Sequence, residues 1–170
     1  NAADAAGISL FLVPAKAPGV RAVRQWRVDS RNAAVVTFSN AQGGLLGREG
    51  EGLGVLEEVV DLATAALCAE MLGSMSEAFA RTLHYLKNRM QFGVPIGSFQ
   101  ALQHRMVEMM ISYEQARSMA YLACVKIDTP PPAERRHVIS AAKIKIADAC
   151  RHVSQESVQL HGGMGMTEEL

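Results

Sequence analysis

The sequence predicts a mainly α-helical fold, with long antiparallel helices of an up-down four-helix-type bundle (three present), preceded by a few short β-strands. Three observations predict it. Apolar residues recur every three or four positions along three long stretches between Val55 and Leu160. Proline and glycine gather between these stretches at only two places, near residues 92–97 and 129–132. The first 50 residues instead carry short apolar runs that are typical of strands.

The strands are expected first along the chain. Gly7 to Val13 form a compact apolar run that Pro14 ends, and residues 33–38 form a second run. Residues 21–28 alternate weakly between them. We therefore expect residues 1–50 to form two or three short strands with a glycine-rich linker from Gly43, and residues 51–170 to form a separate helical domain.

Three helices should follow. The first apolar pattern begins at Val55 and ends near residues 89–91. Ser98 is the expected N-cap of a second helix that stops before residue 129. The third pattern runs from about residue 132 to Leu160, where glycines provide a C-terminal stop. Helices of about 27 to 35 residues would each be about 40 to 50 Å long, and their short connections require antiparallel packing.

Composition excludes several classes of function. Seventeen basic residues balance 17 acidic ones without clustering, so we expect no nucleic-acid partner. Three widely spaced cysteines predict neither a disulfide framework nor a zinc site, which favours the cytoplasm, or the mitochondrial matrix in a eukaryote. No apolar run reaches the about 18 residues that a membrane span needs. Because the chain opens with Asn1 and not Met, we expect a piece of a larger protein. Because three helices leave a four-helix bundle without its last member, we expect a fourth helix just beyond Leu170.

A glycine-rich loop at residues 50–54 opens the first helix and invites interpretation as a phosphate site. We reject that interpretation because the preceding strand ends near Phe38, too far back for a tight strand-turn-helix unit. Glu49 and Glu51 would also repel a phosphate. Turn chemistry and charge favour a loop between domains.

Arg89, Gln91 and Phe92 lie together at the end of the first helix, and Phe99 and Gln100 open the next one. Alone, Arg89 would only complement the helix dipole. With these neighbours the site can bind a nucleotide. A guanidinium can hold a pyrophosphate through two hydrogen bonds, amides can hydrogen-bond the polar edges of the nucleotide, and aromatic rings can cover its apolar faces.

A second segment ends the third helix 70 residues later, with the sequence Gln159-Leu160-His161-Gly162-Gly163. An ordinary helix C-cap explains one glycine but not three within residues 162–165. The missing side chains would let a flat ligand lie against the backbone. The other histidines share no metal-ligand spacing, so we predict no metal site.

These segments together resemble the acyl-CoA dehydrogenase family. The resemblance covers nearly the whole chain: the strands are similar to the end of the family's middle β domain, and residues 51–170 to its C-terminal helical bundle domain. It rests on Arg89-x-Gln91-Phe92-Gly93, on Ser98-Phe99-Gln100, on Lys143 and on residues 159–163. In that family FAD binds between subunits.

The resemblance implies a binding role for each segment. Arg89 and Gln91 would approach the pyrophosphate of a neighbouring subunit's FAD, with Phe92 beside them. Phe99 and Gln100 would lie near the adenosine part. The adenine and pyrophosphate region would also be lined by Gln159, Leu160, His161, Gly162 and Gly163, again from a partner subunit. A homodimer or a dimer of dimers is implied.

The implied reaction is α,β-dehydrogenation of an acyl-CoA thioester, an oxidoreductase step on a CH–CH bond in fatty acid metabolism. A carboxylate takes the α-proton, the β-hydride passes to the flavin, and electrons go on to an electron-transfer flavoprotein or a similar acceptor. The family's usual Glu base would lie beyond Leu170. In a smaller group similar to isovaleryl-CoA dehydrogenase the base stands early in the first helix, at the position of Ala63.

Two further positions depart from the family or bear on the substrate. Thr64 takes the place of an Arg that the family usually carries. Asp61 is a candidate for the acyl-CoA pocket, although a carboxylate near the polar start of a helix is more often solvated.

Alternatives stay open at this point. The chain could be a non-catalytic subunit or a remnant that keeps the bundle for assembly, which the loss of a base at Ala63 would fit. It could be a helical interaction bundle without flavin. It could also belong to a relative with the same fold, such as an acyl-CoA oxidase or a flavin monooxygenase.

Overall fold

The computed structural model describes residues 7–128 and 131–167, and it is mainly α-helical, which confirms the predicted fold class. Its long helices are α1 (Gly52–Asn88), α2 (Gln100–Lys126) and α3 (Pro132–His161), with 37, 27 and 30 residues. The chain divides into two compact units, residues 1–58 and 59–170, so that α1 begins in the first unit and continues in the second.

The first unit contains four short strands, one more than the sequence predicts. Strands β1 (Leu10–Leu12) and β4 (Gly44–Leu46) pair antiparallel. Strands β2 (Val20–Gln25) and β3 (Ala33–Phe38) form a hairpin. β3 has the bounds of the predicted run. We missed β4 because three residues beside glycines carry no alternating pattern, and only pairing with β1 makes them a strand.

The glycines at the start of α1 have a packing role. The backbone N–H of Gly50 donates to Ser9 Oγ at 2.8 Å, and that of Gly52 donates to the Ile8 carbonyl at 2.8 Å. A Cβ on Gly52 would lie 2.9 Å from the same carbonyl oxygen, so a larger residue would push the strand away. Close backbone approach inside the first unit therefore accounts for this loop.

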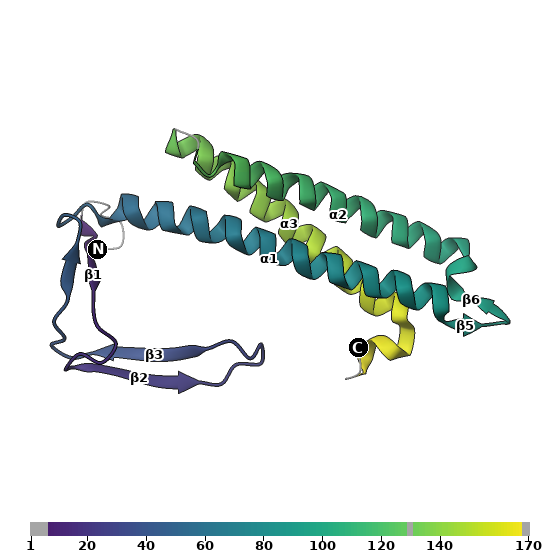
Figure 1. Cartoon of the computed structure of the whole chain (residues 1–170), viewed down its shortest axis with the longest axis horizontal. Helices are drawn as coiled ribbons and strands as arrows, with labels where there is room; N and C mark the ends of the chain where they lie inside the picture. Colours follow the sequence, from purple (N-terminus) through teal and green to yellow (C-terminus); the bar gives the residue numbers. More distant parts are fainter. Residues whose placement is uncertain (1–6, 129–130, 168–170) are drawn as a thin grey trace. The chain divides into compact units, whose positions relative to one another are not determined.

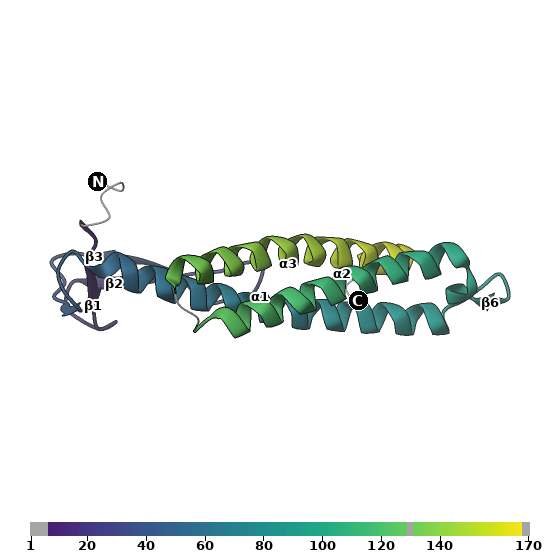
Figure 2. The same ribbon diagram turned by 90° about the horizontal axis from the view of Figure 1, so that it is seen from above.

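In the second unit the three helices alternate in direction, with α2 and α3 side by side (Figures 1 and 2). Five alanines among the buried residues, Ala116, Ala120, Ala123, Ala142 and Ala149, let the backbones of α2 and α3 approach closely. Larger side chains such as Met75, Met109 and Ile146 fill the remaining core. Each helix thus contributes one buried stripe, as its apolar period predicts.

The Asp61 carboxylate is buried, which corrects the expectation that it is solvated. Its side chain is only 8% exposed, and its Oδ2 accepts a hydrogen bond of 3.0 Å from Nε of Arg135, whose side chain is 13% exposed. The sequence could not show this because the partner stands 74 positions away on α3. The pair joins α1 to α3.

The connection between α1 and α2 is a hairpin and not the plain loop that its breakers predict. Strands β5 (Met90–Gln91) and β6 (Val94–Pro95) pair antiparallel. The two turn residues, Phe92 and Gly93, both have positive φ, 57° and 80°, as a two-residue hairpin turn requires.

The predicted N-cap at Ser98 is wrong. A short 3-10 turn, η2 (Ile96–Ser98), follows the hairpin, and Phe99 caps α2 without a side-chain hydrogen bond. Ser98 lies one residue before the cap position, and its hydroxyl donates to the Pro95 carbonyl within the turn at 2.7 Å.

The end of α3 agrees with the predicted glycine stop. Gly162 is the C-cap, with φ 60° and ψ −137°, and its N–H donates to the Gln159 carbonyl. The 3-10 turn η3 (Gly162–Met166) then folds back on the helix, where a Cβ on Gly165 would collide with the Val158 carbonyl oxygen. Gly162 and Gly165 are therefore required for different reasons, the first by its positive φ and the second by close packing.

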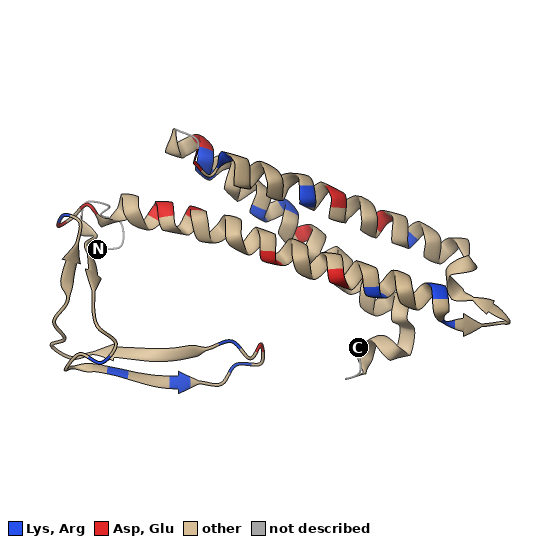
Figure 3. Ribbon diagram, viewed as in Figure 1, with Lys and Arg blue, Asp and Glu red and all other residues tan. Residues whose placement is uncertain are grey.

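Charge along α1 changes sign with position (Figure 3). Its acidic residues, from Glu57 to Glu77, precede its basic ones, Arg81 and Lys87, which suits the negative end of the helix dipole. Across the described residues, no helix combines the length and apolarity needed to cross a membrane. Cys68, Cys124 and Cys150 are free thiols.

Candidate functional site

The two segments singled out in the sequence line one pocket of about 480 Å³. The end of α1, the hairpin, the start of α2 and the end of α3 form its walls. Its lining residues are Tyr85, Arg89, Gln91, Ile96, Leu102, Arg105, Gln159, Leu160, His161, Gly162, Gly163 and Met164. We call it the helix-end pocket. Tertiary packing thus brings together residues that lie 70 positions apart in the sequence.

Arg89 has a fixed backbone and an available side chain. Its N–H closes the last turn of α1 on the Tyr85 carbonyl at 2.8 Å, and its own carbonyl accepts from Ile96 N–H at 2.8 Å. No ion-pair partner for its guanidinium is present among residues 7–128 and 131–167. The guanidinium can therefore meet an anion from outside this chain.

Arg105 is a second cation of the pocket, and sequence reasoning missed it. Its Nε donates to Glu156 Oε2 at 2.6 Å and its Nη2 donates to Oε1 at 2.9 Å. The hydrogen bonds raise the pKa of the guanidinium and lower the pKa of the Glu156 carboxyl. The two residues stand 51 positions apart on different helices, so no local motif marks them.

His161 is buried, with only 5% of its surface exposed. Its Nδ1 lies 2.7 Å from the Ser157 carbonyl oxygen, which can only accept, so Nδ1 carries a hydrogen. In the neutral ring Nε2 is then an acceptor. The ring also packs on Tyr85, with centroids 4.4 Å apart. The sequence singled out His161 only by its position before the glycines.

The glycines at the pocket leave its rim without side chains. A Cβ on Gly162 or Gly163 would meet no atom within 4 Å, so the space beside both is open. Gly162 is required by its positive φ, whereas Gly163 is not. Nothing in the described packing demands a glycine at position 163.

Other predicted site residues lie outside this pocket. The ring of Phe92, in the hairpin turn, meets the ring of Phe99, the N-cap residue of α2, edge to face with centroids 6.2 Å apart. Phe92 is 90% exposed. Gln100 is exposed at the first position of α2, and Asp61 lies in its ion pair with Arg135.

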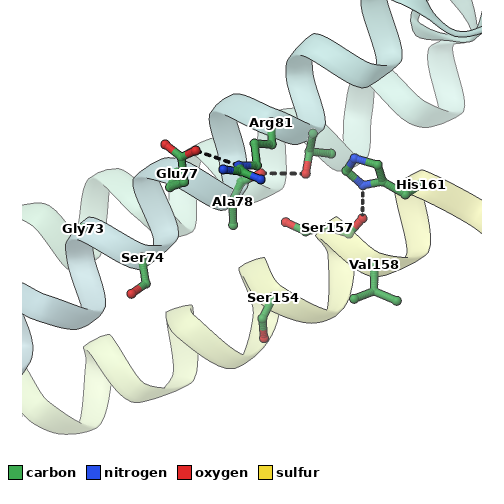
Figure 4. A pocket seen from close by; sticks show the side chains of 10 residues that line it. Gly73, Ser74, Glu77, Ala78, Arg81, Ser154, Ser157, Val158 and His161 are labelled. Atoms are coloured by element: carbon green, nitrogen blue, oxygen red, sulfur yellow. Dashed lines mark hydrogen bonds and ion pairs between the residues drawn. The ribbon is translucent and has the colours of Figure 1, made fainter. Parts of the chain in front are cut away.

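Two further pockets border His161. One, of about 640 Å³, lies between α1 and α3 and contains the ion pair of Glu77 with Arg81 (Figure 4). Within it Ser157 Oγ is buried and finds no hydrogen-bond partner in the described part of the chain. The other, of about 580 Å³, has a mostly apolar lining and shares Arg89 with the helix-end pocket. No cluster of side chains suited to a metal occurs in the residues that the structure describes.

Known proteins are similar to this chain in fold and in sequence. Residues 50–170 match the family model described as acyl-CoA dehydrogenase, C-terminal domain. Acyl-CoA dehydrogenase IpdE2 of Mycobacterium tuberculosis is 36% identical over 111 residues, which are 65% of this chain and 33% of that protein. Butyryl-CoA dehydrogenase from Megasphaera elsdenii aligns with a TM-score of 0.91 at 26% identity, over 100% of this chain and 45% of that chain.

A structure of PigA with FAD and proline aligns with a TM-score of 0.87 at 28% identity, over 97% of this chain and 44% of that chain. The chain therefore spans between a third and a half of the length of these relatives. Since the family model covers more than half of the chain, this protein belongs to the acyl-CoA dehydrogenase family.

Proposed function

We propose that this chain is the nucleotide-binding and oligomerising part of an FAD-dependent acyl-CoA dehydrogenase that catalyses α,β-dehydrogenation of an acyl-CoA thioester. The observation that carries the proposal is the helix-end pocket, in which Arg89 and residues 159–163 lie together. Family membership supports the reaction, and the similar PigA structure contains FAD.

The residues of the pocket fit a dinucleotide. Arg89 offers a guanidinium that has no ion-pair partner among the described residues, and none of the lining residues that the structure describes carries a carboxylate. The volume of about 480 Å³ lies in the range of about 300 to 1,000 Å³ that is usual for small-molecule sites. A site of this size suits the nucleotide part of FAD, with the flavin ring held by other segments or by a second subunit.

Each residue then has a role in holding the cofactor. The Arg89 guanidinium binds the pyrophosphate, and the side-chain amides of Gln91 and Gln159 hydrogen-bond the polar groups of the cofactor beside it. Leu160 offers an apolar surface, and His161 offers its Nε2. The rings of Phe92 and Phe99, with Gln100, contact the adenosine where the ligand extends past the hairpin.

FAD supplies the redox chemistry, since it accepts the hydride from the acyl β-carbon when a base removes the α-proton. The electrons pass to an electron-transfer flavoprotein or a similar acceptor. Asp61 remains a candidate for the acyl-CoA side, acting together with the Arg135 that holds it.

We further propose a homodimer or a dimer of dimers. Long apolar side chains remain exposed on the outer faces of the bundle helices, among them Met110 at 50%, Ile144 at 66% and Val125 at 73%. Clustered exposed apolar surface favours burial against another subunit. The same assembly would bring the pocket against FAD that a neighbouring subunit holds.

The proposal is tested by Arg89→Ala in the full-length protein, with Arg151→Ala as a control on the exposed face of α3. We expect Arg89→Ala to lower the FAD content while far-UV circular dichroism stays unchanged, and the control to retain FAD. A panel of acyl-CoAs should bleach the flavin of the unmodified protein. Unchanged FAD content in Arg89→Ala would contradict the pocket assignment, and retained FAD without bleaching would favour a non-catalytic subunit.

A further inference from the structure

The ion pair between Arg105 and Glu156 lies at the edge of the helix-end pocket: Arg105 lines it, and Glu156 stands about one helical turn before its α3 residues. On α3, Glu156 precedes Gln159 and Leu160 by three and four positions, so the three side chains share a face. On α2, Arg105 follows Leu102 by three positions, and both line the pocket. The pair therefore connects the helix turns that carry the pocket residues.

The geometry of the pair restricts both helices. Two parallel hydrogen bonds, at 2.6 and 2.9 Å, fix the angle between the guanidinium and carboxylate planes as well as their distance. The side chains are 37% and 20% exposed, so water screens this pair less than it screens Asp148 with Arg151, which are 62% and 69% exposed. Sliding or rotation of α3 against α2 would break at least one of the two hydrogen bonds.

The charges of Arg105 and Glu156 cancel, so the Arg105 guanidinium is less available to an outside anion than that of Arg89. Glu156 occupies two of the five N–H donors of Arg105 and neutralises its charge. Arg89 has no such partner among the described residues. The pocket thus contains one cation that is available to an anion and one that is already used inside the protein.

We propose that Arg105 and Glu156 are positioning residues for the FAD nucleotide, which hold the last turn of α3 against α2 so that Gln159 and Gly163 meet the ligand beside Arg89. This inference rests on the proposed function of the pocket. Arg105 acts through the placement of α3 and not through a bond of its own to the phosphates. A loosened turn would leave the bundle folded and would weaken the grip on the ligand.

The test is a double-mutant cycle in the full-length protein, with Glu156→Gln, Arg105→Gln and the two together. The FAD dissociation constant is measured by flavin fluorescence at a temperature where circular dichroism shows every variant folded. We expect each single substitution to raise the dissociation constant about tenfold, and the double variant to be no weaker than either single one. Asp148→Asn, which removes an exposed ion pair of α3, should leave the constant unchanged.

Three results would overturn the inference. A Glu156→Gln variant with a lower thermal midpoint and unchanged FAD affinity would show that the pair has a structural role alone. A much larger loss in Arg105→Gln than in Glu156→Gln would make Arg105 a direct ligand contact. Independent, additive losses would show that the two residues do not act as a pair. Failure of the proposed function is distinguishable, because Arg89→Ala would then also leave FAD affinity unchanged.

Discussion

The imidazole of His161 lies on the ring of Tyr85, with centroids 4.4 Å apart and planes inclined by 33°. This contact joins the last turn of α3 to the last turns of α1, at the border of all three pockets. Nδ1–H of His161 donates a hydrogen bond to the Ser157 carbonyl oxygen, four residues earlier on α3, and this bond fixes the orientation of the ring. His161 therefore serves the packing of the bundle as well as the proposed ligand.

We expect His161→Ala to destabilise the protein by about 2 kcal/mol, because it removes a buried ring contact and a buried hydrogen bond. Tyr85→Phe is the matched control, since it keeps the aromatic ring, and its cost should stay within about 0.5 kcal/mol. Denaturant unfolding followed by circular dichroism measures both. Equal costs for the two variants would argue against a packing role for the ring pair.

We expect Asp61→Asn to destabilise by about 3 kcal/mol, because it removes the charge that Arg135 faces inside the bundle. Replacing both residues with apolar ones, as in Asp61→Leu with Arg135→Met, should recover most of the loss. The free energy of unfolding of the single and double variants decides it. A double variant less stable than Asp61→Asn would show that the charges themselves stabilise the bundle.

The ion pair of Arg105 with Glu156 predicts a dependence of stability on pH. The hydrogen bonds from Arg105 lower the pKa of the folded Glu156 carboxyl below that of the unfolded chain. The stabilisation is therefore fully present above the unfolded value of about 4.3 and is lost as pH falls through the lower folded value. Thermal midpoints of the unmodified protein and of Glu156→Gln should differ at pH 7 and converge in acid. A constant difference would refute this origin.

Alanine substitutions at two neighbouring glycines should have different effects, one on stability and the other on FAD binding. Gly162→Ala should cost about 1 to 2 kcal/mol, because an L side chain is strained at φ 60°. Gly163→Ala should fold normally, since its Cβ meets no atom within 4 Å, but it should weaken FAD binding if the ligand lies on that backbone. Gly54→Ala, equally unobstructed and inside α1, is the control with full FAD affinity. Normal FAD binding by Gly163→Ala would exclude close approach at that point.

Much of the fold could be predicted because its signals are local. The apolar period located three helices, and the bounds of α3 followed from Pro132 at its start and Gly162 after its end. The hairpin at residues 90–95 could not be predicted in this way, because Phe92 at positive φ is an unusual choice for such a turn. Strand β4 likewise exists only through its partner β1.

The candidate site could likewise be predicted from the sequence only in part. Arg89, Gln91 and the segment from Gln159 to Gly163 could be found from residue types near helix ends. Their meeting in one pocket could not, because it depends on how α1, α2 and α3 pack.

By itself the sequence determined the helices, their order and the family, since amphipathic period, breakers and short motifs act over a few residues. Only the tertiary structure decided which charges are paired. Asp61 is buried on Arg135 and Arg105 is held by Glu156, whereas Arg89 has no ion-pair partner in the described part of the chain. The physical reason is that an ion pair depends on distance across the bundle, and residues 51 or 74 positions apart become neighbours only when the helices pack.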